Sequence, residues 1–195
     1  DISWAIGCGM VKGLGLPAHF GKSNLFIAEA DEYVTDPDHD KTPRFFWQNP
    51  EIFVVTNIDF DHPDVYNSLD EVQTAFKKMI LERVSGITII NLDDQASKIL
   101  FSAKFANVSY GFNPKATLSI RKVRFESNRT YFHLTYENSD IGEFSLKIPG
   151  RHNVANAAAA ALACSLIGIS WLQIRAGLAK FGGAKRRFEK VGLVN

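Results

Sequence analysis

Three short, unbroken apolar runs constrain the fold of this chain more than any other feature. They cover residues 25–30, 52–58 and 87–92, and β-branched residues are frequent in them. Runs of this length and composition are typical of strands covered on both faces, as in a parallel sheet. Acidic residues close each run. The sequence therefore predicts a buried sheet whose strands end in carboxylates.

Helical patterns alternate with these runs. One begins at Ser68, where Glu71 three residues later suggests a capping box, and its apolar positions repeat with a helical period. A second helix is expected over residues 94–105. Strand–helix alternation favours an α/β fold, a mostly parallel sheet flanked by helices.

The pattern changes between residues 108 and 148. Three segments tend to alternate apolar with polar residues, and turn-forming residues at 127–128 and 138–142 separate them. The sequence therefore predicts a small antiparallel β sub-sheet, a meander over about 108–148 with one solvated face. The three segments are 116–125, 130–136 and 143–148. Two helices, over 153–167 and 170–181, are expected after it, each followed by glycine.

Charge and composition narrow the range of partners. Lys and Arg total 22 against 21 for Asp and Glu, which gives a formal net charge of +1. A balanced charge offers no electrostatic case for nucleic acid or a membrane surface. No apolar stretch approaches the roughly 20 residues that span a bilayer. The two cysteines suggest neither a zinc site nor a disulfide framework, which fits a reducing cytoplasm.

The strongest site signal is positional. Ligands of open α/β sheets bind beyond the carboxyl ends of the strands, and five polar side chains fall there. Carboxylates with an imidazole suit Mg²⁺ or Mn²⁺. The alternative, that acidic residues only cap strands and start loops, stays open. The five are Glu29, Asp31, Asp59, Asp61 and His62.

Two other stretches look like sites but favour plainer interpretations. Residues 20–23 (Phe-Gly-Lys-Ser) resemble the end of a phosphate-binding loop. That motif needs an earlier glycine where Leu16 stands, and it must open a helix, whereas the next element here is expected to be a strand. The run 36–40 (Asp-Pro-Asp-His-Asp) favours a solvated loop over a metal site.

Two basic or turn-rich stretches could meet an anion. Residues 149–153 (Pro-Gly-Arg-His-Asn) precede the Ala-rich helix, whose N-terminus would face an anion or a polar ring. Asn153 could instead be only an N-cap. Residues 185–189 (Lys-Arg-Arg-Phe-Glu) form a cationic cluster, either a solvated linker or, through Arg187, a phosphate ligand.

Four of these stretches together resemble the Mur ligase family. Their order and spacing are similar to the family's central, ATP-binding domain across residues 1–195, from shortly after its P-loop to its end. The stretches are 28–32 (Ala-Glu-Ala-Asp-Glu), 55–62 (Val-Thr-Asn-Ile-Asp-Phe-Asp-His), 149–154 with Asn156, and 185–189.

The resemblance implies an ATP-dependent carboxylate–amine ligase. It implies ATP with Mg²⁺ (or Mn²⁺), and ligation of L-alanine to UDP-N-acetylmuramate through an acyl phosphate. Alternatives are the family's murein tripeptide-recycling ligase, a relative resembling folylpolyglutamate synthetase, or a non-catalytic nucleotide-binding domain. By the same resemblance Glu29 and His62 are metal ligands, Asn57 lies near the phosphates or the muramate, His152 and Asn153 contact adenine, and Arg187 reaches the ATP phosphates.

The sequence also departs from the family pattern. The glycine-rich P-loop with its lysine is absent from these residues and is expected upstream, and the family's amino- and carboxy-terminal domains are absent too. Without them the chain alone is expected to be inactive. Residues 33–48 form a longer stretch than in alanine-adding members, and Tyr33 after Glu32 is similar to the tripeptide-recycling ligase.

Overall fold

A six-stranded sheet organises the molecule. A computed structural model describes residues 1–11, 13–101 and 107–184, and its sheet has the order β11-β10-β9-β8-β7-β6. Neighbours from β6 to β9 pair in parallel, while β9, β10 and β11 pair antiparallel. This confirms the predicted α/β class. The strands are β6 (Ile52–Val55), β7 (Ile87–Asn91), β8 (Asn107–Gly111), β9 (Leu118–Phe125), β10 (Thr130–Tyr136) and β11 (Ser139–Leu146).

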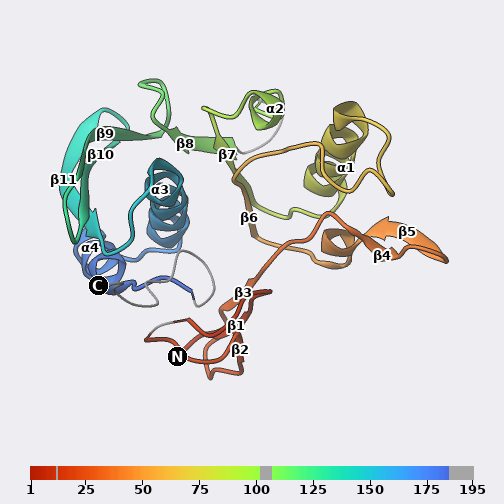
Figure 1. Ribbon diagram of the computed structural model, residues 1–195, viewed down its shortest axis with the longest axis horizontal. Coiled ribbons are helices and arrows are strands. Elements are labelled where there is room, and N and C mark those ends of the chain that lie inside the picture. The colour runs from red at the N-terminus through yellow and green to blue at the C-terminus, as the bar shows by residue number, and fades with distance from the viewer. Residues whose placement is uncertain (12, 102–106, 185–195) are drawn as a thin grey trace, which may run out of the picture.

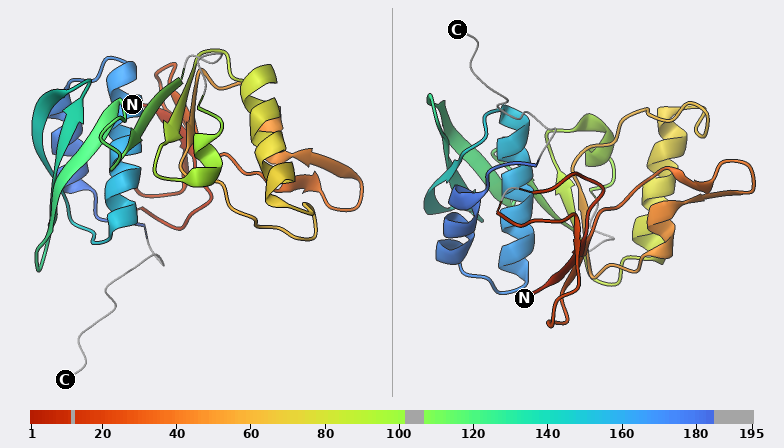
Figure 2. Two further views of the ribbon diagram at one scale, coloured as in Figure 1. Left: turned by 90° about the horizontal axis from the view of Figure 1, so that it is seen from above. Right: turned by 60° about the horizontal axis from the view of Figure 1, so that its bottom comes forward.

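Helices cover both faces of this sheet. The sheet curves around α3 (Arg151–Leu166), while α1 (Leu69–Glu82) and α2 (Gln95–Lys98) lie on the other side (Figures 1 and 2). Helix α4 (Trp171–Lys180) packs against α3 and β11. Among the helices of the described residues, none combines the length and hydrophobicity that crossing a membrane requires.

Strand β7 explains why the apolar runs are continuous. Successive side chains of a strand point to opposite faces, so Ile89 joins the core under α3 and Ile90 joins the core under α1. Both residues are fully buried. A strand between two helical layers therefore needs apolar residues at every position, as the sequence predicted.

Helix α1 begins as the sequence predicted. Ser68 is its N-cap, and the Ser68 hydroxyl accepts a hydrogen bond from the Glu71 amide at 3.3 Å. The Glu71 carboxylate accepts from the Asn67 amide at 2.9 Å, one residue before the N-cap, and not from the Ser68 amide as the predicted capping box requires. Helix α2 is shorter than expected and ends at Lys98, because the Leu100 and Phe101 amides bond three residues back in tighter turns.

The antiparallel strands extend the main sheet rather than forming a layer of their own. Strand β8, within the segment expected as a meander, pairs in parallel with β7 and β9, so antiparallel pairing begins with the β9–β10 pair. The turn expected at 138–142 is tighter: Tyr136 pairs with Ser139 across Glu137 and Asn138, both with positive φ. Two such residues match a type I′ hairpin turn, so β11 starts at Ser139, earlier than expected.

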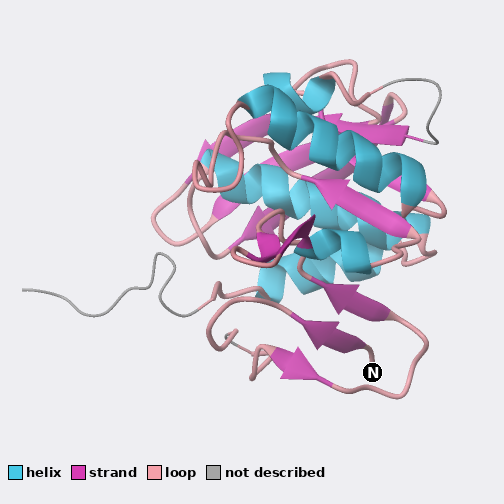
Figure 3. Cartoon of the chain, turned by 90° about the vertical axis from the view of Figure 1, so that its right-hand side faces the viewer, coloured by secondary structure: helices cyan, strands magenta, loops and turns pink. Residues whose placement is uncertain are grey.

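The first apolar run does not join the main sheet. Strand β3 (Phe26–Ala28) pairs in parallel with β1 (Ser3–Ala5), which pairs with β2 (Ala18–His19), and this small sheet lies apart from the main one (Figure 3). Phe26 is 64% exposed and Ile27 is 53% exposed. The expectation that this run is covered on both faces was wrong, because apolar sequence indicates an extended segment but does not select its partner strands.

The acidic run at 36–40 forms the turn of a short hairpin. Strands β4 (Val34–Asp36) and β5 (Asp40–Pro43) project at one end of the molecule (Figure 1). The Asp36 carboxylate accepts hydrogen bonds from the Asp38 and His39 amides. The 3₁₀ helix η1 (Arg44–Trp47) follows and buries Phe45 and Phe46.

The N-terminus of α4 carries a complete capping box and yields a first prediction. The Ser170 hydroxyl accepts from the Gln173 amide, and the Gln173 side chain accepts from the Ser170 amide at 3.2 Å. Ser170→Ala should lower the free energy of unfolding by about 1 kcal/mol, measured by urea denaturation. Ser127→Ala, in an exposed turn, is the control and should change it by less than about 0.5 kcal/mol. Equal effects would contradict a role for the cap.

Candidate functional site

The carboxyl ends of three parallel strands form a continuous hydrogen-bonded edge. The Asn91 side chain, at the end of β7, donates to the Thr56 carbonyl after β6 at 2.8 Å. The Asp93 carboxylate accepts from the Phe112 and Asn113 amides after β8, at 2.5 and 3.0 Å. This edge, here called the sheet rim, is where open α/β sheets bind ligands.

The N-terminus of α3 lies at the same rim. The Arg151 guanidinium sits over the Phe112 ring, 3.4 Å from its centroid. Gly150 allows the helix to start here: its φ is +109°, and a Cβ would lie 2.7 Å from the His152 ring. Among the described residues no side chain caps this helix, and an uncapped helix N-terminus is a setting that favours an anion.

The predicted adenine-contacting pair lies in the first turn of α3. His152 is exposed, and Asn153 donates from its side chain to the Pro149 carbonyl at 2.6 Å. Gly150 is the N-cap residue, so the alternative that Asn153 is only an N-cap was wrong. The helix also starts two residues earlier than expected, at Arg151.

Three potential metal ligands converge further along the loop after β6. His62 Nε2 lies 3.5 Å from a Glu32 carboxylate oxygen and 3.9 Å from an Asp61 carboxylate oxygen. These three residues, Glu32, Asp61 and His62, are here called the His62 group, and one ligand atom of each lies within 4.8 Å of the others. Donors about 2.1 Å from one Mg²⁺ are about 3.0 Å apart in adjacent positions and about 4.2 Å in opposite ones. The two distances from His62 Nε2 lie between these values, and carboxylate oxygens with an imidazole are donors that suit a divalent cation.

Neighbouring tyrosines hold this group in place. The Tyr33 and His62 ring centroids are 4.7 Å apart, and the Tyr33 hydroxyl donates to Asp64 at 2.7 Å. That hydrogen bond raises the pKa of Tyr33 and lowers the pKa of Asp64. The Tyr66 hydroxyl donates to the Glu32 carbonyl at 2.6 Å, and burial, with the Glu32 charge, raises the pKa of Tyr66 to about 12.

The remaining predicted residues have separate environments. Glu29 accepts a hydrogen bond from the Gly7 amide at 2.5 Å, and Asp31 pairs with Arg44 at 2.8 Å. Asp59 accepts from the adjacent Phe60 amide. Asn57 follows β6 at the rim, where its side-chain oxygen accepts from Thr56 at 3.2 Å. Arg187 lies outside the described residues.

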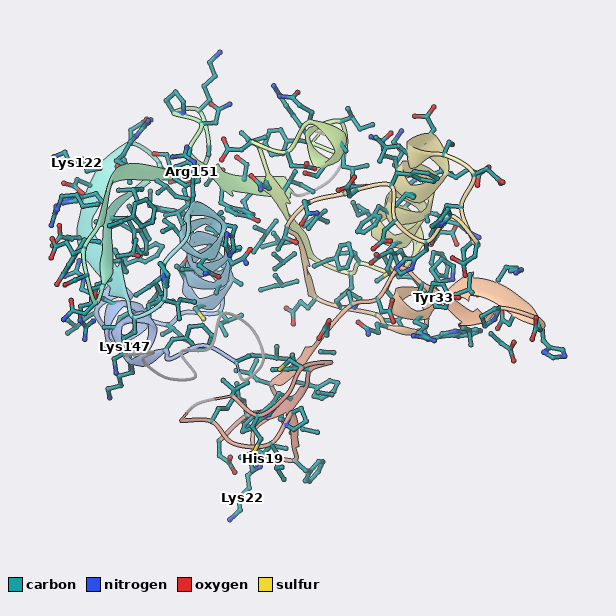
Figure 4. All side chains as sticks on the ribbon, viewed as in Figure 1. His19, Lys22, Tyr33, Lys122, Lys147 and Arg151 are labelled. Atoms are coloured by element: carbon teal, nitrogen blue, oxygen red, sulfur yellow. The ribbon has the colours of Figure 1, made fainter. Side chains whose placement is uncertain are left out.

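Glu32 is the residue whose position the sequence did not predict. Within the described part of the chain, the ion pairs of His62 are with Glu32 and Asp61. Glu32 was evident only as one of several acids after an apolar run. The α3 end of the rim and the His62 group are also set apart, as the labelled Arg151 and Tyr33 show in Figure 4.

Comparison with known proteins decides the family. The sequence model of the Mur ligase middle domain matches residues 23–164. The chain belongs to the Mur ligase family. The matched span contains both the His62 group and the N-terminus of α3, so both parts of the candidate site lie in the family's middle domain.

Two curated relatives of the Mur ligase chain illustrate the sequence similarity. A UDP-N-acetylmuramate–L-alanine ligase of Carboxydothermus hydrogenoformans is 37% identical over 94% of this chain and 38% of the relative. One of Geobacter sulfurreducens is 34% identical over 96% of the chain and 39% of the relative. The chain thus spans about two fifths of the length of these relatives.

Solved structures show the same fold. The UDP-N-acetylmuramate:L-alanyl-γ-D-glutamyl-meso-diaminopimelate ligase of Neisseria meningitides has a TM-score of 0.82 at 23% identity, covering 94% of this chain and 58% of its own. UDP-N-acetylmuramate–alanine ligase of Thermotoga maritima has a TM-score of 0.74 at 21% identity, covering 96% and 41%. At these identities the likeness concerns the fold.

Proposed function

We propose that this chain is the central, ATP-binding domain of an enzyme that joins L-alanine to UDP-N-acetylmuramate in peptidoglycan precursor synthesis. The match of residues 23–164 to the Mur ligase middle domain carries the proposal. The choice of L-alanine rests on curated relatives of that name at up to 37% identity. The partners are the amino- and carboxy-terminal domains of the same enzyme, and the compartment is the ATP-containing cytoplasm.

The reaction proceeds by phosphoryl and then acyl transfer. The substrate carboxylate attacks the γ-phosphorus of ATP and releases ADP, which gives an acyl phosphate. The amine of L-alanine attacks the acyl carbon, loses a proton and expels phosphate through a tetrahedral intermediate. No covalent bond to the enzyme forms, so the protein acts by positioning groups and stabilising charge.

The His62 group holds the cation in this proposal. A bound Mg²⁺ or Mn²⁺ supplies charge neutralisation at the transferring phosphoryl group. Glu29 and His62 are the ligands that the family resemblance implies. Glu32 and Asp61 are the carboxylates facing His62 Nε2, and they add negative charge that favours a divalent cation there.

The rim receives the nucleotide. His152 and Asn153 contact adenine in the proposal, and the Asn153 amide nitrogen bonded to Pro149 leaves its oxygen to accept from the adenine amino group. The α3 amides face the phosphates. In the proposal Asn57, on the loop after β6, contacts the phosphates or the muramate, and Arg187 reaches the phosphates.

A substrate assay of the full-length enzyme tests this function. The protein is incubated with UDP-N-acetylmuramate, ATP-Mg²⁺ and one amine donor, and phosphate release and product mass are followed. We expect turnover with L-alanine and none without the sugar nucleotide. Turnover with murein tripeptide alone would instead indicate the recycling ligase. No turnover with any donor, together with retained ATP binding, would indicate a non-catalytic nucleotide-binding protein.

A further inference from the structure

Tyr33 has a place beside the candidate cation site that the proposed reaction does not yet use. Its ring lies against His62, with ring centroids 4.7 Å apart and planes inclined at 56°. His62 stands on a loop with a positive φ of 57°, and its side chain is 31% exposed. The imidazole is therefore largely covered, and the Tyr33 ring is the aromatic part of its surroundings.

Tyr33 is itself fixed at both ends. Its hydroxyl donates to Asp64 at 2.7 Å, and its amide donates to the Asp31 carboxylate at 2.9 Å. The Arg44 guanidinium lies 5.3 Å from the Tyr33 ring centroid and pairs with Asp31 at 2.8 Å. The ring therefore presents a defined surface to His62 rather than a mobile one.

We propose that Tyr33 is a positioning residue that holds the His62 imidazole in the orientation needed to bind a divalent cation. In this orientation Nε2 faces the Glu32 and Asp61 carboxylates. Residues around a metal-binding histidine commonly fix its ring, and their loss weakens the site. A preoriented ring also loses less conformational freedom on binding. The proposal rests on the metal-binding role that the proposed function gives to His62.

The alternative is that Tyr33 only anchors the β4–β5 hairpin. Trp47 provides a matched residue for this possibility. Trp47 is 62% exposed, and its indole nitrogen donates to the Thr35 hydroxyl on β4 at 2.7 Å. Trp47→Leu removes an aromatic side chain and a hairpin hydrogen bond without touching His62. A purely structural role would make the Tyr33 and Trp47 variants behave alike.

Mn²⁺ binding to the full-length enzyme, measured by the electron paramagnetic resonance signal of free Mn²⁺ without nucleotide, tests the proposal. Tyr33→Leu should weaken Mn²⁺ affinity by about 10-fold or more. Tyr33→Phe, which keeps the ring, should restore most of the affinity, and Trp47→Leu should leave it unchanged. In the ligase assay, Tyr33→Leu should raise the KM for Mn²⁺ more than it lowers kcat.

The outcomes separate this proposal from the proposed function. Unchanged Mn²⁺ affinity in Tyr33→Leu, or equal losses in Tyr33→Leu and Trp47→Leu, would overturn the positioning role. The proposed function would survive such a result, provided that His62→Ala still weakens Mn²⁺ binding and the wild type still ligates L-alanine. A wild type without ligase activity, but with weaker Mn²⁺ binding in Tyr33→Leu, would overturn only the function. Should Tyr33→Leu fail to fold, Tyr33→Met replaces it, because methionine fills similar space without a ring face.

Discussion

Replacing His62 with alanine in the full-length enzyme is expected to reduce kcat by about 100-fold or more. Loss of residues that merely support a metal ligand commonly costs 10–100-fold, so loss of a ligand should cost at least the upper value. Stability should change little, by about 1 kcal/mol or less, because the side chain is 31% exposed and lies on a loop outside the core. Steady-state phosphate release and thermal unfolding, measured on the same preparation, separate the two effects.

His39→Ala is the matched control for this variant. His39 also stands beside a carboxylate, 3.3 Å from Asp36, but its side chain is 82% exposed on the β4–β5 turn. We expect near-normal kcat for it. Near-normal kcat in His62→Ala would remove this histidine from the metal site. Glu29→Ala, tested in parallel, should resemble His62→Ala, because the family resemblance assigns both residues to the same cation.

Phe132→Ala is expected to lower the free energy of unfolding by about 3–5 kcal/mol. Phe132 lies on β10 and is 0% exposed, within the core that α3 covers. Its ring packs on Phe144 of β11, with centroids 6.0 Å apart. Truncation removes apolar contacts and leaves a cavity that the rigid sheet cannot close. Urea denaturation measures the loss.

Phe125→Ala controls for the general cost of removing an aromatic ring from this sheet. Phe125 ends β9 and is 56% exposed. We expect a loss of less than about 1 kcal/mol. Comparable losses in Phe125→Ala and Phe132→Ala would mean that the core under α3 is less tightly packed than the complete burial of Phe132 indicates.

The sequence predicted those parts of the fold that depend on local patterns. The β6 and β7 runs, the Ser68 cap and the Ala-rich helix follow from side-chain period, capping chemistry and composition. The partner of a strand depends instead on residues far along the chain. For this reason the 25–30 run was placed in the wrong sheet, and β8 was assigned to an antiparallel segment although both its neighbours are parallel.

The same distinction applies to the candidate site. His62 and the α3 N-terminus were recognisable because strand ends and helix starts place ligand-binding groups at known positions. The approach of Glu32 to His62, the tilted ring contact of Tyr33 with His62 and the Arg151–Phe112 contact join segments up to 39 residues apart. No local pattern encodes such contacts, so they required the folded structure. The roles of all the predicted site residues stay predictions, namely those of Glu29, Asn57, His62, His152, Asn153 and Arg187.

Helix α3 contacts every strand from β6 to β10, and its buried alanines let it lie close to them. Because α3 packs against five strands, we expect it to keep a fixed orientation relative to the sheet. The adenine end of the proposed nucleotide site is therefore preformed, and it moves only as one block with the sheet. In the proposed enzyme, an opening that admits ATP or releases ADP would therefore come from loops or domains around that block, and motions of those segments, rather than of α3, would limit the rate of turnover.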